Sequence, residues 1–250
     1  MTPSSLVILV LAVLGVYAIG MGRTAGQVSA SRQRWHLASF MLGLLAAFVI
    51  FLPSPNLFGP DYRFTVNMGQ FLLAVEVAPP LLLLGIPGAM LRPLRRWETA
   101  GRRLTGPVVV GLVSTIALLG WFVPVVFEAA SRDLTTWLLK QIVFLLAGLL
   151  RWWPVAGGLP AWKPAYPGQL VYLFAIRMPT TIVGVIIGFA NTLLYRSSVG
   201  LELCAPASLP DQQIGGLVMW SVGGLIMVFA LAIIVYRWFG ALDVVDSKEF

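Results

Sequence analysis

Seven stretches of the chain are apolar over roughly the length of a membrane-spanning helix, and short links of polar residues, proline or glycine separate them. An α-helix needs about 20 mostly apolar residues to cross the hydrocarbon core of a bilayer. The pattern therefore predicts an all-α bundle of seven transmembrane helices, with approximate bounds 5–21, 36–52, 65–87, 107–127, 134–150, 169–194 and 214–236. Since the links are too short for a separate soluble domain, residues 1–250 are predicted to form a single domain.

The third stretch, TVNMGQFLLAVEVAPPLLLLGIP at 65–87, differs from the others because polar residues and two prolines interrupt it. Asn67, Gln70 and Glu76 would be costly against lipid. Pro79 and Pro80 leave backbone carbonyl groups without their usual helical partners. Because the hydrocarbon core holds no water to satisfy such groups, we expect this helix to be central and enclosed by the others.

Composition supports a multi-pass membrane protein surrounded by a lipid bilayer. The chain is 58% hydrophobic and 11% charged, with a mean hydropathy of +0.88, whereas soluble domains average about 25% charged residues. The net charge of +7 does not indicate a nucleic-acid partner, because twelve of the 17 basic residues, Arg151 among them, fall on one side of the predicted bundle and three on the other. The positive-inside rule then places the N-terminus outside and the C-terminus in the cytoplasm.

Three ionisable residues fall inside predicted spans, where charge is rare and costly. Glu76 and Arg177 both lie roughly 12 to 15 Å from the cytoplasmic ends of their helices, counted at 1.5 Å per residue. We expect them to pair, either as a structural clamp or as part of a proton or ion relay. Lys140 lies nearer the outside and is expected to extend toward an acidic residue there: Glu128, Asp133 or Asp211.

The sequence carries no motif for nucleotide binding, hydrolysis or a two-metal centre. His36 is the one histidine and is expected to have an interfacial structural role. The single cysteine, Cys204, excludes an internal disulfide and any site built on a cysteine pair. We therefore expect a protein without catalytic activity and without a cofactor.

Five segments, in order and at matching spacing, carry a family resemblance: NMGQFLLAVEVAPPLLLLGIP, WFVPVVFEAA, FLLAGLLRWWPV, LVYLF and DQQIGGLVMW. They resemble landmarks of the CtaG family of cytochrome c oxidase assembly proteins, the caa3-type group of seven-helix membrane proteins. The resemblance covers about residues 35–238. It implies a bacterial inner (plasma) membrane protein that takes part in the biogenesis of haem-copper oxidases, with oxidase subunits as partners, in a family associated with supplying copper.

The chain departs from the resembled pattern where that pattern has histidine. Asn67, Phe71, Phe122 and Gln141 stand at these positions, and neither phenylalanine nor a carboxamide replaces an imidazole as a copper ligand. All four are expected in the outer third of the bundle. We infer a metal-free plug in which Phe71 and Phe122 fill the former site, while five polar residues hydrogen-bond one another: Asn67, Gln141, Asp211, Gln212 and Gln213. Alternatively, Asp211 caps the seventh helix.

Three functional classes follow from these observations. The favoured one is a metal-free accessory or assembly subunit associated with a haem-copper cytochrome c oxidase. The second is a copper-delivery assembly factor that uses Met68, Met219 and Cys204 as ligands. The third is a proton or small-ion carrier built on Glu76 and Arg177, with proline breaks in its helices.

Overall fold

The computed structural model describes residues 3–23, 29–52, 60–91, 106–157, 163–195 and 203–246, and every regular element in these ranges is helical. A 3₁₀ turn, η1 (Pro60–Tyr62), leads into a central span made of α4 (Arg63–Leu72), the π-helical segment η2 (Leu73–Val77) and α5 (Ala78–Gly85). The other helices are α1 (Pro3–Arg23), α2 (Ala30–Ile50), α7 (Pro107–Gly120), α8 (Pro124–Arg132), α9 (Leu134–Ala156), α10 (Tyr166–Gly188) and α11 (Leu209–Asp246).

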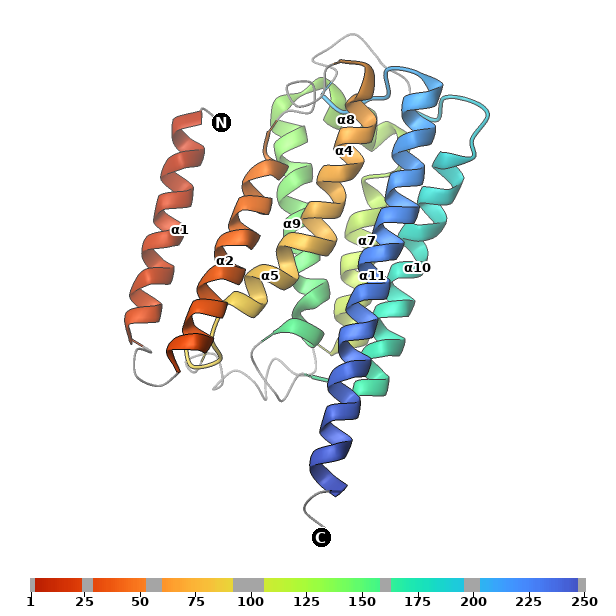
Figure 1. The fold of residues 1–250 in the computed structure, drawn as a ribbon. Helices are drawn as coiled ribbons and strands as arrows, with labels where there is room; N and C mark the ends of the chain where they lie inside the picture. Colours follow the sequence, from red (N-terminus) through yellow and green to blue (C-terminus); the bar gives the residue numbers. More distant parts are fainter. Residues whose placement is uncertain are drawn as a thin grey trace.

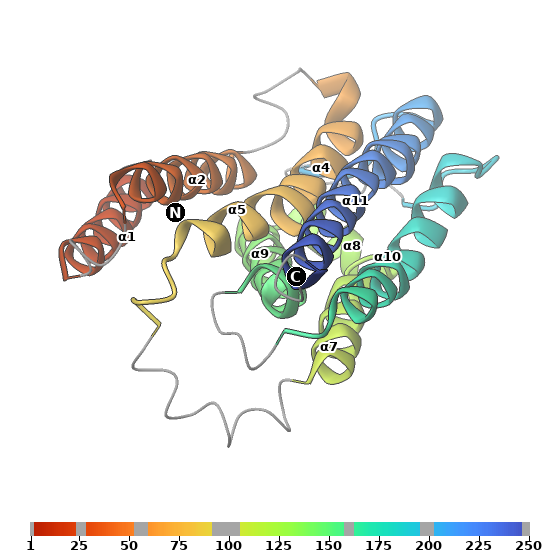
Figure 2. The same ribbon diagram turned by 60° about the horizontal axis from the view of Figure 1, so that its bottom comes forward.

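The helices stand side by side as a bundle, with α1 and α2 at one side, α10 and α11 at the other, and the two termini at opposite ends (Figure 1). Seen from the end that carries the C-terminus, α9, α7, α10 and α11 form an arc that the central span closes, and α2 and α1 lie beyond it (Figure 2). Within the described ranges, five helices are long and apolar enough to cross a membrane, and the bent pair α7–α8 makes a sixth.

The central position of the third stretch is confirmed. In its most apolar window 61% of the residues are buried, against 22–39% in the other four spans. Pro79 and Pro80 have no N–H, so the carbonyl of Val75 lacks a partner in either α or π register. The indole Nε1 of Trp152, on α9, donates to that carbonyl at 2.9 Å. Gly148 lets α9 come this close, because a Cβ there would collide with the backbone of η2.

The fourth stretch is not one helix, which corrects the prediction for 107–127. It breaks into α7 and α8, which meet at a bend of 65°. Pro124 begins α8, and the residue before a proline is disfavoured in helical conformation. Val123 is accordingly extended, with φ −65° and ψ 126°. The hydroxyl of Tyr195 donates at 3.0 Å to the carbonyl of Phe122, one of the groups that the break frees.

Arg151 does not lie on the cytoplasmic side of the bundle, where the charge count predicts it. The fifth helix continues to Ala156 instead of ending near residue 150, so Arg151 lies inside the bundle and is fully buried. The hydropathy pattern predicts the end of the fifth helix at Arg151, because a charged residue is costly inside a membrane. The helix nevertheless continues, because the charge of Arg151 has partners within the protein. The available signal was the run LLRWWPV, which contains no turn residue before Pro154.

Candidate functional site

A buried ionic cluster joins the central span to the helices around it. Arg177 Nη1, on α10, lies 3.3 Å from the Oε1 of Glu76 on η2, so the predicted contact is present. Arg151 Nη2, on α9, lies 3.8 Å from the same oxygen. All three residues are at most 2% exposed. We call Glu76, Arg151 and Arg177 the inner ionic cluster; Arg151 is the member that sequence reasoning missed.

Backbone carbonyl groups complete the inner ionic cluster. Arg177 Nη2 donates to the carbonyl of Met219 on α11 at 2.6 Å, and Arg151 Nη2 donates to the carbonyl of Ile176 on α10 at 2.7 Å. A side chain at Gly223 would collide with the Arg177 guanidinium. The cluster thus fastens η2, α9, α10 and α11 together, as a structural clamp requires.

The charges of this cluster do not balance. Two guanidinium groups face one carboxylate, so a positive charge remains in the apolar interior. Some of the polar atoms, including Glu76 Oε2 and Arg151 Nε, have no hydrogen-bond partner within the described part of the chain. Burial of such groups is costly, and removing any one member changes the balance for the others.

A second cluster, toward the other end of the bundle, is aromatic. The ring of Phe71 meets Phe122 at a centroid distance of 5.3 Å and Phe144 at 5.0 Å, both edge to face. Phe127 stacks on Phe122 at 6.5 Å. These four phenylalanines, which we call the aromatic cluster, are all buried. Two of the expected former histidine positions, Phe71 and Phe122, therefore lie in direct contact.

Lys140 lies at this aromatic cluster and does not extend toward the surface as predicted. It is fully buried, its Nζ lies 3.0 Å from the Oδ1 of Asn67, and it stands 4.9 Å from the ring centroid of Phe127. The thiol of Cys204 adjoins the ammonium. An amide oxygen and the negative face of an aromatic ring both stabilise a cation, which explains why Lys140 stays inside.

The acidic residues expected as partners of Lys140 have partners of their own. Glu128 pairs with Arg132 at 3.4 Å, one turn along α8. The carboxylate of Asp133 accepts the backbone N–H of Thr136 at 2.8 Å and so caps the N-terminus of α9. Its hydrogen bonds with Thr136 hold the pKa of Asp133 below its usual value.

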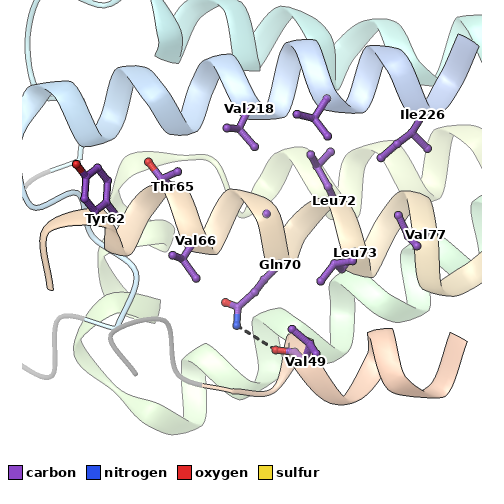
Figure 3. Close-up of a pocket in the computed structure, with 12 residues that line it drawn as sticks. Val49, Tyr62, Thr65, Val66, Gln70, Leu72, Leu73, Val77, Val218 and Ile226 are labelled. Carbon is purple, nitrogen blue, oxygen red and sulfur yellow. Dashed lines mark hydrogen bonds between the residues drawn. The ribbon is translucent and has the colours of Figure 1, made fainter. Parts of the chain in front are cut away.

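The predicted network among Asn67, Gln141, Asp211, Gln212 and Gln213 does not form. Each of these side chains instead bonds a group outside the set. Gln141 Nε2 donates to the carbonyl of Ile50 at 2.8 Å. Gln70 Nε2 donates to the carbonyl of Val49 at 3.1 Å, beside a groove of about 690 Å³ between α2, the central span and α11 (Figure 3). Both amides thus bond carbonyl groups in the last turn of α2.

The glutamines at the start of α11 form hydrogen bonds with the backbone of the segment that follows α10. Gln212 Nε2 donates to the carbonyl of Thr192 at 3.1 Å, and its Oε1 accepts the N–H of Leu194 at 2.7 Å. Gln213 Nε2 donates to the carbonyl of Ala190 at 3.0 Å. Gln212 and Gln213, expected to hydrogen-bond other polar residues around the former metal site, thus anchor irregular backbone at the end of the bundle.

Asp211 connects two helix N-termini. Its carboxylate accepts the backbone N–H groups of Phe64 at 3.1 Å and Thr65 at 2.9 Å, which caps α4 from a residue 146 positions later in the chain. It also accepts the N–H of Ala207 at 3.0 Å, while Ser208 Oγ accepts the N–H of Asp211 at 3.3 Å. Asp211 therefore does not cap its own helix as predicted, because α11 begins at Leu209 and Ser208 accepts the free N–H of its first turn. The helix that Asp211 caps is α4.

The two clusters differ in what they offer a ligand. Among the residues that the structure describes, no three His, Cys, Asp or Glu side chains come close enough to hold a metal ion. Met68, Met219 and Cys204 are all buried in the same hydrophobic core. A resident ammonium and aromatic rings occupy the expected outer site, whereas the inner ionic cluster joins helices.

Comparison with protein families identifies a match that spans most of the chain. The model of the family described as cytochrome c oxidase caa3 assembly factor (Caa3_CtaG) matches residues 15–241, which include both clusters and every element from α2 to the greater part of α11. Searches of curated proteins and of solved structures found no match.

Proposed function

Because the chain belongs to the cytochrome c oxidase caa3 assembly factor family, we propose that it acts in the biogenesis of a haem-copper cytochrome c oxidase as a metal-free accessory or assembly subunit. The family match supports the assembly role and an oxidase as the partner. The metal-free character rests on this chain's own residues. The inner ionic cluster supports a structural clamp over a proton or ion carrier, because each of its arginines also bonds the backbone of a neighbouring helix.

The observation that carries the proposal is the position of Lys140. Its ammonium lies against Asn67 and the aromatic cluster, where the family resemblance places histidines. A fixed cation at this point repels a copper ion, and the repulsion is strong because the surroundings are apolar. The phenylalanines at 71 and 122 offer no donor atoms. The site is therefore filled by a side-chain cation in place of a metal.

We further propose seven spans, with the N-terminus outside and the C-terminus in the cytoplasm of a bacterial plasma membrane. The two termini lie at opposite ends of the bundle, which supports an odd number of membrane crossings (Figure 1). The link at 92–105, which carries five of the arginines used in the charge count, lies outside the described residues. A reporter fused after Phe250 should be cytoplasmic and one inserted at Ala207 should be external; both on one side would refute seven spans.

Copper delivery through Met68, Met219 and Cys204 is the competing function. All three are soft donors and all are buried in one core. The thiol of Cys204, however, already adjoins the ammonium of Lys140. Under the metal-free proposal, the purified protein holds far less than one copper per chain, and added Cu(I) does not raise its melting temperature beyond a nonspecific effect. Stoichiometric copper that is lost in Cys204→Ala would favour the delivery function.

A gain-of-function variant tests the location of the former site. Asn67→His, Phe71→His, Phe122→His and Gln141→His together, combined with Lys140→Met, should create Cu(I) affinity that the parent lacks. The matched control carries four histidines at exposed apolar positions on separate helices, Leu45, Ile116, Val171 and Leu225. Equal copper binding by the control would show that histidine number, and not the aromatic cluster, creates the affinity.

Binding of the chain to oxidase subunits is tested in an experiment separate from the test of copper binding. Affinity purification in mild detergent should co-elute oxidase subunits with the parent chain, with or without copper in the medium. Association that depends on copper would contradict a metal-free role. Absence of any oxidase subunit after chemical cross-linking in membranes would contradict the role in oxidase biogenesis.

A further inference from the structure

A narrow groove runs along the lower half of α11 as drawn in Figure 1, between α5, α9 and α11. It has a volume of about 310 Å³. Its walls are mainly apolar and include Pro80, Leu84, Val155, Phe229 and Ile233. Glu76 of the inner ionic cluster lines its deep end, and Arg237 lines its other end, toward the C-terminus.

The dimensions of this groove fit a single hydrocarbon chain. Along α11 it extends from Ile226 to Arg237, a separation of about 16 Å at 1.5 Å per residue. This is close to half of the roughly 30 Å hydrocarbon core, which is the depth of one leaflet. A volume of about 310 Å³ over this length describes a channel much thinner than a helix. A partner helix, about 10 Å across, is too wide for such a groove.

A positive side chain, Arg237, lies at the mouth of the groove, and the charge of a second one, Lys163, acts on it from nearby. Arg237 is exposed, and Lys163, in the segment that precedes α10, is close enough to feel its charge. Partial burial, and after it the charge of Arg237, lower the pKa of Lys163. Neither cation has an acidic partner among the side chains that the structure describes. Two cations of this kind at one end of the groove attract an anion to its mouth.

We propose that this groove binds an anionic phospholipid, with the phosphate at Arg237, where the charge of Lys163 also attracts it, and one acyl chain along α11 toward Ile226. Basic pockets between helices at a membrane surface recognise anionic headgroups, and the apolar walls supply the second half of the site. The mouth provides charge selectivity, while the groove provides selectivity for an amphiphile over a free anion. This inference goes beyond the role in oxidase biogenesis and does not depend on it.

Native mass spectrometry of the detergent-purified full chain tests the proposal. The protein is incubated with phosphatidylglycerol or with phosphatidylethanolamine of the same acyl chains, and phosphatidylglycerol should be retained preferentially. Lys163→Gln with Arg237→Gln should reduce its retention by roughly 30-fold, since each basic residue near an anionic surface contributes about fivefold. The matched control, Arg23→Gln with Arg32→Gln, makes the same charge change at the same end of the bundle, outside the groove. It should retain the lipid.

A second variant tests the contribution of the apolar groove separately from that of the charged mouth. Ala230→Phe fills the groove and should reduce retention, whereas Ala232→Phe, on the exposed face of α11, should not. Soluble glycerophosphoglycerol should compete only weakly, because it has no acyl chain. Equal retention of the two lipids, loss in the charge control, or normal binding by Ala230→Phe would each overturn the proposal. Full displacement by the soluble headgroup at equal concentration would also overturn it.

Discussion

The Nζ of Lys140 lies 3.0 Å from the Oδ1 of Asn67, with both side chains buried and the two residues 73 positions apart in the chain. This bond brings α9 and α4 together beside the aromatic cluster. The sequence predicts different surroundings for the two residues. Lys140 is expected near the surface, and Asn67 is expected at a position where the resembled family has histidine. Their contact places a side-chain cation beside the positions where the resembled family has histidine, and under the proposed function this cation takes the place of a metal.

This bond predicts unequal effects of the two substitutions. Asn67→Leu leaves a buried ammonium without its oxygen acceptor and should lower the free energy of unfolding by about 1–3 kcal/mol. Lys140→Met removes the buried charge itself and should be close to neutral or stabilising. Asn67→Leu with Lys140→Met should recover most of the loss, measured by denaturant unfolding in detergent. An additive double variant would show that the bond does not stabilise the fold.

The inner ionic cluster predicts that its carboxylate matters more than either arginine. Glu76→Gln leaves two buried guanidinium groups without a counter-charge and should cost about 3–5 kcal/mol of unfolding free energy. Arg177→Met should cost less, because Glu76 and Arg151 remain as a pair. Glu128→Gln is the matched control, since it makes the same change in a more exposed pair with Arg132 and should cost at most about 1 kcal/mol. Equal losses at Glu76 and Arg177 would mean that Arg151 takes no part.

Asp211 should behave as a helix cap. Asp211→Ala removes the acceptor for the first N–H groups of α4 and should cost about 1–2 kcal/mol. Asp211→Asn keeps an oxygen acceptor and should cost less. Thr65→Val removes only the hydroxyl that also bonds Asp211, so its effect should be smaller than that of Asp211→Ala. Hydrogen exchange should localise the loss of Asp211→Ala to the start of α4; protection lost only in α11 would contradict the cap.

The lowered pKa of Asp133 predicts a pH effect of defined sign. Its hydrogen bonds with Thr136 favour the carboxylate, so the folded-state pKa lies below the unfolded one. The stabilisation is complete above the unfolded pKa and is lost as the pH falls through the folded pKa. Unfolding measured from pH 7 down to about pH 3 should therefore show a parent-minus-Asp133→Asn difference that shrinks with acidity. A difference that grows as the pH falls would contradict the assigned hydrogen bonds.

The sequence by itself determined the properties that lipid imposes on each segment separately. Apolar stretches of spanning length are required wherever the chain crosses a bilayer, so most helices could be read directly from the pattern. The polar and proline-interrupted stretch at 65–87 had to be central, because freed carbonyls such as that of Val75 need protein donors. The contact between Glu76 and Arg177 followed from depth, which residue counting measures.

Tertiary structure alone decided which polar group meets which partner. Depth does not fix the rotation of a helix about its axis or the identity of its neighbours, so the sequence predicts surface acids as the partners of Lys140, whereas the structure pairs it with Asn67. For the same reason the sequence does not reveal the interior position of Arg151, and it predicts a polar network for Gln141, which in the structure bonds the carbonyl of Ile50. Asp211 caps α4 only because packing brings two distant helix ends together. These partners are set by the packing of helix against helix, and hydropathy along one chain carries no record of it.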